Sequence, residues 1–219
     1  MKLSNLFRHL SLVLRHKWRV FINCAKCGLI WRGLVHDLSK FSPSEFFESV
    51  KYFQGNRSPI GVCRKLNGYS AAWLHHKGRN KHHIEYWTDR ECEVQPLMPY
   101  KYAVECVCDK LAATRIYAGK NYSTDLPLDH WQKHGCKEGG NPKTMKFVES
   151  VFIDVKNKGE AAVLNKKYMK EMYGIKLGHK TIKANCLGKT KKDWYGEIEI
   201  NGVLTKLHWT LEEINAYND

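Results

Sequence analysis

The fold of this chain depends on the stretch Gly33-Leu34-Val35-His36-Asp37-Leu38-Ser39-Lys40-Phe41. In it, His36 and Asp37 place an imidazole beside a carboxylate, between apolar residues instead of in a solvated run of charges. Histidine nitrogen together with carboxylate oxygen suits zinc, iron or manganese. The pair therefore predicts a divalent-metal site to which other parts of the chain contribute ligands.

Further candidate ligands lie on both sides of this pair. They are His16, His75, His76, His82, His83 and Asp109. A lone buried histidine is more often a hydrogen-bonded core residue than a ligand. Here, however, several histidines and two aspartates follow one another beside apolar residues. Ligands on separate helices converge only if those helices pack as a bundle, with each ligand facing the core.

Length and composition limit the classes of protein. With 219 residues and 43% hydrophobic content, the chain can bury a sizeable core, as one domain with an appendage. It has no run of eighteen apolar residues, which excludes a membrane span. The amino terminus has no secretory cleavage pattern, so a cytoplasmic protein is expected. Cys24, Cys27, Cys106 and Cys108 are interpreted as small core residues with reduced thiols.

The formal net charge of +14 predicts a negatively charged partner, such as a nucleotide, a phosphate ester or nucleic acid. Many of the lysines fall between Lys143 and Lys192. They are consistent with a solvated helical face or with nucleic-acid binding by the basic carboxy-terminal third.

Apolar spacing predicts a mainly helical body. The expected helices are Leu3 to Gly28, about Leu29 to Leu38, Glu45 to Phe53, a segment from Tyr69 through His75, the segment after Pro99 to Tyr117, Lys143 to Lys156 and Gly159 to Tyr173. The run Ser42-Pro43-Ser44-Glu45 has the pattern of a capping box. The glycine and proline content predicts a loop over residues 55–67 and an irregular connection over residues 121–142.

The pattern changes near the carboxy terminus. Residues 181–209 alternate polar and apolar side chains, and Asn201-Gly202 is typical of a hairpin turn. The expected fold class is therefore mainly α with a small carboxy-terminal β-hairpin segment. Two parts are expected, a helical metal-binding domain over residues 1–175 and a small basic β segment over residues 176–219.

The order of His16, His36-Asp37 and Asp109 resembles that of the HD-domain superfamily, whose members are helical metal-dependent phosphohydrolases and phosphodiesterases. His36-Asp37-Leu38-Ser39-Lys40 is similar to the His-Asp-x-Gly-Lys version of many members, with Ser39 in place of the usual glycine. A closer similarity, from His36 to about Trp131, is to a bacterial and phage family of HD-like proteins without an assigned function. It rests on His36-Asp37-Leu38-Ser39-Lys40-Phe41, on His75-His76 with Asn80, His82-His83 and Glu85, and on Cys108-Asp109 before Ala112-Ala113-Thr114. Ile84 stands where that family usually has proline.

The resemblance implies an HD-domain-like helical bundle that holds one or two divalent ions (Mn, Fe, Zn, Co or Mg). Its implied ligands are His16, His36, Asp37, His76, His82 and Asp109. The number of ions stays open, because the middle histidines could instead bind phosphate. The choices between His75 and His76 and between His82 and His83 also stay open. Neighbours on a helix point about 100° apart, so His82 and His83 are not expected to serve the same ion.

The resemblance further implies a phosphohydrolase, either a phosphomonoesterase or a phosphodiesterase, that acts on a nucleotide or other small phosphate ester through a metal-activated water. Asp37, Lys40 and His83 would be catalytic, with Lys40 neutralising phosphoryl oxygens and His83 donating a proton. Lys40, Arg79 and Asn80 would bind substrate. Two alternatives are an HD-type di-iron oxygenase and a nucleic-acid-binding accessory protein with a structural metal site.

Overall fold

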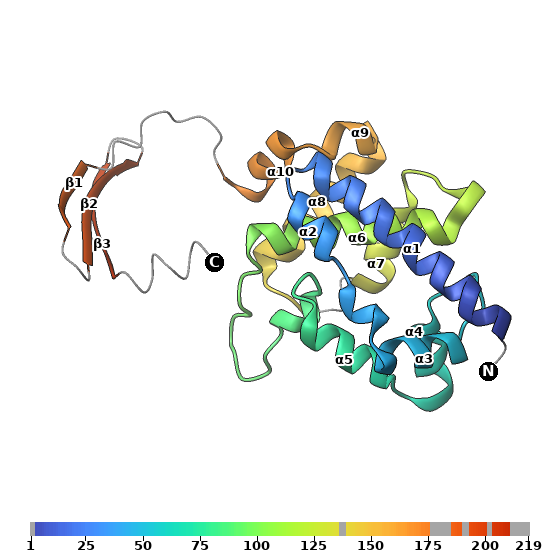
Figure 1. Cartoon of the computed structure of the whole chain (residues 1–219). Coiled ribbons are helices and arrows are strands. Elements are labelled where there is room, and N and C mark those ends of the chain that lie inside the picture. Colours follow the sequence, from blue (N-terminus) through green and yellow to red (C-terminus); the bar gives the residue numbers. More distant parts are fainter. Residues whose placement is uncertain (1–2, 136–138, 176–184, 190–192, 201–202, 211–219) are drawn as a thin grey trace. The chain divides into compact units, whose positions relative to one another are not determined.

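The computed structural model describes residues 3–135 and 139–175, together with the backbone of residues 185–189, 193–200 and 203–210. The chain divides into two units, Met1–Ile175 and Lys176–Asp219. The first unit is helical (Figure 1), so the prediction of a mainly α fold is confirmed. None of the described helices combines the length and apolar character needed to cross a bilayer.

The helices of the first unit follow one another along the chain, with the connections differing in length. They are α1 (Leu3–Lys26), α2 (Ile30–Val35), the 3-10 helix η1 (Leu38–Phe41), α3 (Pro43–Lys51), α4 (Pro59–Asn67), α5 (Ala71–Arg79), the 3-10 helix η2 (Ile84–Trp87), α6 (Tyr100–Ala118), the 3-10 helix η3 (Gly119–Asn121), α7 (Leu126–His134), α8 (Pro142–Lys158), α9 (Glu160–Val163) and α10 (Lys166–Tyr173).

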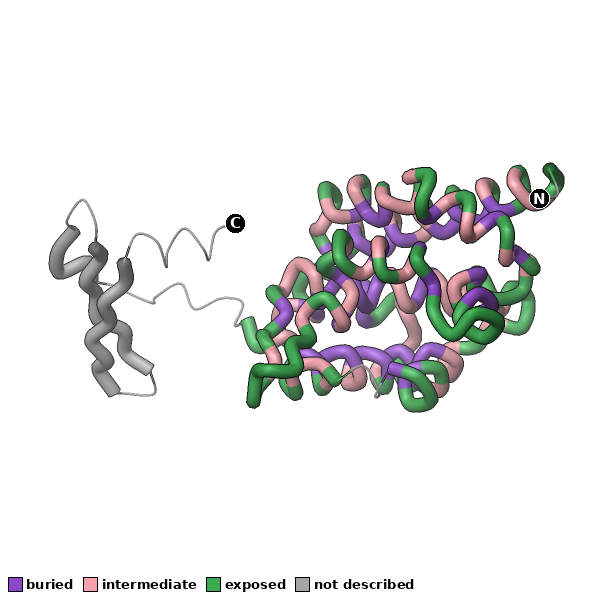
Figure 2. Tube along the Cα trace, turned by 90° about the horizontal axis from the view of Figure 1, so that it is seen from below, coloured by how far each residue is buried: buried purple, intermediate pink, exposed green. Residues whose placement is uncertain are grey.

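The two long helices α1 and α6 organise the unit. α1 packs against α2, α3 and α6, while α6 also packs against α7 and α8. Buried positions follow the inward sides of the helices (Figure 2). The apolar core is continuous from Val20 on α1 through Val107 and Leu111 on α6 to Trp131 and Phe152. Cys24, Cys27, Cys106 and Cys108 lie within this core, which confirms their interpretation as small core residues.

Two helices form where the sequence predicted irregular structure. α4 lies within the predicted loop 55–67, and α7 lies within the looser segment 121–142. In both, a proline stands in the first turn, where its fixed φ suits a helix start and its missing N–H leaves no bond unmade. Each buries only a few residues, so the periodic apolar signal is weak. The prediction of irregular structure was wrong at both places.

α3 begins at Pro43 with Ser42 as its N-cap residue, as predicted, but the capping box is wrong. Ser42 caps no backbone N–H with its side chain, and its hydroxyl lies 3.1 Å from that of Ser44. The carboxylate of Glu45 points away to histidines on α5. Tertiary contacts have therefore overridden the local pattern.

The described residues of the second unit form a three-stranded antiparallel sheet in the order β1-β2-β3, with β1 (Asn185–Lys189), β2 (Asp193–Ile200) and β3 (Val203–Thr210). β2 and β3 pair without a break from Asp193 opposite Thr210 to Ile200 opposite Val203. The register between β1 and β2 shifts between Cys186 and Gly188. The hairpin turn predicted at Asn201-Gly202 lies outside the described residues and stays a prediction.

Gly33 allows α2 to approach α1. A Cβ atom at this buried position would lie 2.9 Å from the Cα of Phe21 and 3.1 Å from the Cβ of Cys24. Gly33→Ala should therefore lower the free energy of unfolding by about 2 kcal/mol, because the backbone must shift. Urea denaturation measures this change. Gly61→Ala is the control: this glycine lies in α4 with nothing near a Cβ, so alanine should be neutral or stabilise by up to about 1 kcal/mol.

Candidate metal centre

The His36-Asp37 pair lies in the turn between α2 and η1. The sequence predicted a helix to about Leu38, but α2 ends at Val35. Asp37 has a φ of 51°, in the left-handed region that aspartate tolerates better than most residues. Lys17 on α1 donates to the carbonyl oxygens of Leu34 at 2.7 Å and His36 at 2.6 Å. These contacts fix the turn with both side chains in the interior.

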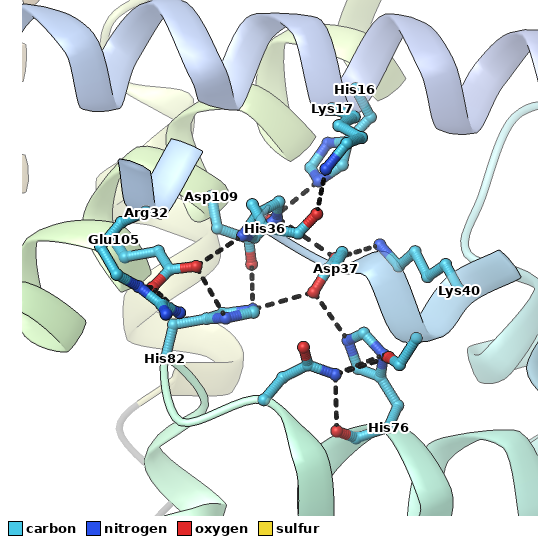
Figure 3. Close-up of polar contacts among 12 residues, drawn as sticks. His16, Lys17, Arg32, His36, Asp37, Lys40, His76, His82, Glu105 and Asp109 are labelled. Atoms are coloured by element: carbon cyan, nitrogen blue, oxygen red, sulfur yellow. Dashed lines mark hydrogen bonds and ion pairs between the residues drawn. The ribbon is translucent and has the colours of Figure 1, made fainter. Parts of the chain in front are cut away.

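A first ligand group consists of His16, His36, Asp37 and Asp109 (Figure 3). His16 Nε2 lies 2.9 Å from Asp109 Oδ1. His36 Nε2 lies 3.2 Å from Asp37 Oδ2 and 3.5 Å from Asp109 Oδ1. The first ligand group thus combines residues from α1, from the turn after α2 and from α6, and these are His16, His36-Asp37 and Asp109 of the sequence analysis.

A second ligand group consists of Asp37, His76, His82 and His83. The other oxygen of Asp37, Oδ1, lies 3.4 Å from His76 Nε2 and 3.3 Å from His82 Nε2. The ring of His83 has its centroid 4.2 Å from that of His82 and 4.8 Å from that of His76. The two oxygens of Asp37 therefore face different sets of histidines.

The structure includes both His82 and His83 in this group, against the expectation that neighbours would diverge. That expectation assumed a helix, whereas the two residues lie in the connection between α5 and η2. Of the two neighbouring histidines on α5, His76 belongs to the second ligand group and His75 does not. His75 lies outside both groups, and its Nδ1 is 2.6 Å from Glu45.

Several ligand atoms in the two groups are buried and make no well-formed hydrogen bond, having at most close contacts with other ligand atoms or with Lys40: His16 Nε2, His36 Nε2, both oxygens of Asp37, His82 Nε2 and His83 Nε2. Leaving buried polar atoms unsatisfied is unfavourable. Their spacing suits coordination, because two neighbouring ligand atoms at about 2.1 Å from one ion lie about 3.0–3.4 Å apart. These buried groups could hold a metal ion.

Two glutamates contact the histidines from outside these two groups, and Glu105 also forms a third possible ligand group with His36 and His82. Glu105 Oε1 lies 3.0 Å from His36 Nδ1 and 3.4 Å from His82 Nδ1. Glu45 Oε2 lies 2.7 Å from His76 Nδ1. A histidine that donates its Nδ1–H to a carboxylate keeps the lone pair of Nε2 for a metal. His36 and His76 share this arrangement, whereas His82 Nδ1 lies near Glu105 without forming a hydrogen bond.

Arg32 on α2 completes this arrangement. Its Nε and Nη2 donate to Glu105 Oε2 at 2.8 and 2.7 Å. Burial alone would raise the pKa of Glu105, but the hydrogen bond from His36, the contact with His82 and the charges of both histidines lower it to about 2. Sequence analysis missed Glu45 and Arg32. Only Glu105 carried a signal, since it lies one helical turn before Asp109.

The charges of the centre are paired with one another. Burial opposes ionisation of Asp37, but the charges of His36 and Lys40 hold the pKa of its carboxyl well below the ordinary value. Burial likewise opposes the charged form of His36. The charge of Asp37 and hydrogen bonds with Asp109, Asp37 and Glu105 nevertheless raise the pKa of His36 well above its ordinary value. Without metal, His36 therefore carries a proton between carboxylates at neutral pH.

The predicted substrate-binding residues are dispersed. Lys40 Nζ lies 2.7 Å from Asp37 Oδ2 and lines a cavity of about 610 Å³ beside the centre. Asn80 instead donates from Nδ2 to Ser39 Oγ at 2.7 Å and to the carbonyl of His76 at 2.8 Å, so it positions the loop that carries a ligand. Arg79 is exposed at the end of α5 and does not line the cavity.

A sequence model described as a family of unknown function, DUF5662, matches residues 5–154. This range covers α1 to most of α8 and contains every residue of both ligand groups. No curated protein and no solved structure matches the chain.

Glu105→Gln should weaken metal binding about 10- to 100-fold, because an amide cannot orient both His36 and His82 as a carboxylate does. Glu45→Gln should weaken only the binding of the ion that has His76 as a ligand. Titration calorimetry with Mn²⁺ or Zn²⁺ measures both effects. Glu149→Gln, on α8 outside both groups, should bind metal as the wild type does. Unchanged affinity in Glu105→Gln would contradict the orienting role.

Metal uptake near pH 7 should release at least one proton per chain, because a coordinated histidine must be neutral whereas His36 is protonated without metal. The release should fade as the pH rises through the raised pKa of His36. Calorimetry in buffers of different ionisation enthalpy measures it. A binding heat that is the same in every buffer at pH 7 would show that no proton leaves.

Proposed function

The chain belongs to a family of unknown function (DUF5662), and we propose that it is a metal-dependent phosphohydrolase of the HD type. Its helical unit would then be an HD-domain-like bundle, as the resemblance of its motifs implies. Its substrate would be a nucleotide or another small phosphate ester, split by water.

The position of Asp37 carries this proposal. Oδ2 faces His36, and Oδ1 faces His76 and His82, so Asp37 could contribute a ligand atom to each of two ions. His16 and Asp109 would complete the first ion's ligands, and His83 would complete the second's. A two-ion centre bridged by a carboxylate is an arrangement that suits phosphoryl transfer.

Divalent ions bound there would supply an acidified water and polarise the phosphoryl group. The residues of the chain have separate tasks. Lys40 faces the cavity beside Asp37, where its ammonium group can neutralise phosphoryl oxygens. Lys110 and Lys133 also line the cavity, and their positive charge favours an anionic substrate.

His83 fits the role of ligand better than the expected role of proton donor. Burial and the charges of His82 and His76 hold the pKa of His83 well below its ordinary value, so its imidazole is neutral at pH 7. Its Nε2 is buried without a hydrogen bond. A neutral imidazole with a free lone pair is suited to coordination.

A di-iron oxygenase is the second candidate, because the same nitrogen and carboxylate ligands suit iron. The identity of the bound ion separates it from a hydrolase. Nucleic-acid binding by the basic carboxy-terminal third stays a prediction, since the side chains after Ile175 lie outside the described residues.

Elemental analysis tests the proposal directly. Protein purified without chelators should carry one or two ions per chain, and Asp37→Asn should lose them. Asparagine tolerates the left-handed backbone of this position, so the variant should still fold. Circular dichroism would check the fold. Metal-loaded wild type should hydrolyse phosphate esters with Mn²⁺, Co²⁺ or Mg²⁺.

Two results would overturn the proposal. Protein that acquires no ion on adding manganese, iron or zinc would remove both enzyme candidates. Iron that is retained on purification, with oxygen-dependent chemistry and no phosphatase activity, would replace the hydrolase with the oxygenase.

A further inference from the structure

The cavity beside the metal centre, which we call the slot, is lined by residues of α1 and α6 and also by residues of α3, α4, α5 and α7. α1 contributes His9, Leu12, Val13 and His16, and α6 contributes Asp109, Ala113 and Tyr117. The spacing of three, four and eight residues places each set on one helix face. Seven to eight residues of helix measure about 10–12 Å. The slot therefore reaches about that far from the ligands His16 and Asp109.

The slot combines polar residues beside the ligands with a large apolar wall. Next to the centre lie His76, His83 and Lys40. The apolar wall is formed by Leu12, Val13, Pro59, Ile60, Ala113 and Tyr117, while Arg57, Lys110, Asp129 and Lys133 add charged groups to the lining. The cavity measures about 610 Å³, so a phosphate group alone would leave the apolar wall in contact with water. Apolar walls of this extent gain free energy only from an apolar occupant.

We infer that the substrate is a phosphate ester whose organic group is an apolar or aromatic body of about nucleoside size. This inference rests on the proposed function. The phosphate would lie at the metal centre, and the organic group would lie along the faces of α1 and α6, against Leu12, Ala113 and Tyr117. Hydrolysis adds water across the P–O bond: phosphorus gains the hydroxyl group, and the leaving alcohol gains the proton. Short hydrophilic esters would be poor substrates.

Phosphonates test the slot without turnover, because their P–C bond resists hydrolysis. We expect manganese-loaded protein to bind 1-naphthylmethylphosphonate at least tenfold more tightly than methylphosphonate, measured by titration calorimetry. Tyr117→Ala removes part of the wall, and Ala113→Phe fills the slot. Each variant should lose most of this tenfold preference while keeping its metal content and its affinity for methylphosphonate.

Tyr69→Ala is the matched control. Tyr69 is exposed and does not line the cavity, so its removal should leave the preference unchanged. Equal affinity of wild type for the two phosphonates would overturn the inference. So would a preference that survives both slot variants, since the naphthyl group would then bind elsewhere.

The outcomes separate the slot from the reaction. Equal affinities together with hydrolysis of short and aromatic esters at similar rates would leave the proposed function standing and remove the slot. A naphthyl preference that depends on Tyr117 and Ala113, in a protein that hydrolyses no ester, would support the slot and remove the hydrolase. Failure of metal-loaded protein to bind either phosphonate would overturn both.

Discussion

The carboxylate of Asp37 is the group around which the helical unit is arranged. It is 3% exposed and lies among histidines from three separate segments, with Lys40 at its edge. A buried charge is tolerated only where it is paired. The left-handed backbone at this residue, which is held by Lys17, turns both carboxylate oxygens toward partners on different elements. The packing of α1, α5 and α6 must therefore satisfy electrostatics as well as shape.

The polar contacts outside the ligand groups tie the helices to one another. Arg32 and Glu105 connect α2 with α6, and Glu45 connects α3 with α5. The continuous apolar core reaches from Val20 on α1 across α6 to Trp131 and Phe152. Two kinds of interaction thus stabilise the unit: burial of apolar surface, and charged pairs that position histidines.

Sequence reasoning succeeded where a signal repeats along the chain. α1 and α6 follow from helical periodicity, and the order of His16, His36-Asp37 and Asp109 identified the first ligand group. It failed where the signal is local or short. α4 and α7 bury few residues, and the capping pattern at Glu45 concealed a contact with α5 that is distant in sequence. The joint placement of His82 and His83 depends on a non-helical connection that no periodicity reveals.

A single oxygen atom of Glu105 faces one histidine from each ligand group, His36 and His82. Whatever fixes one of these rings also fixes the carboxylate and, through it, the other ring. Occupancy of one half of the centre therefore changes the ordering entropy that remains for the other half. By thermodynamic linkage the effect is reciprocal, so the two ligand groups should not titrate as independent sites.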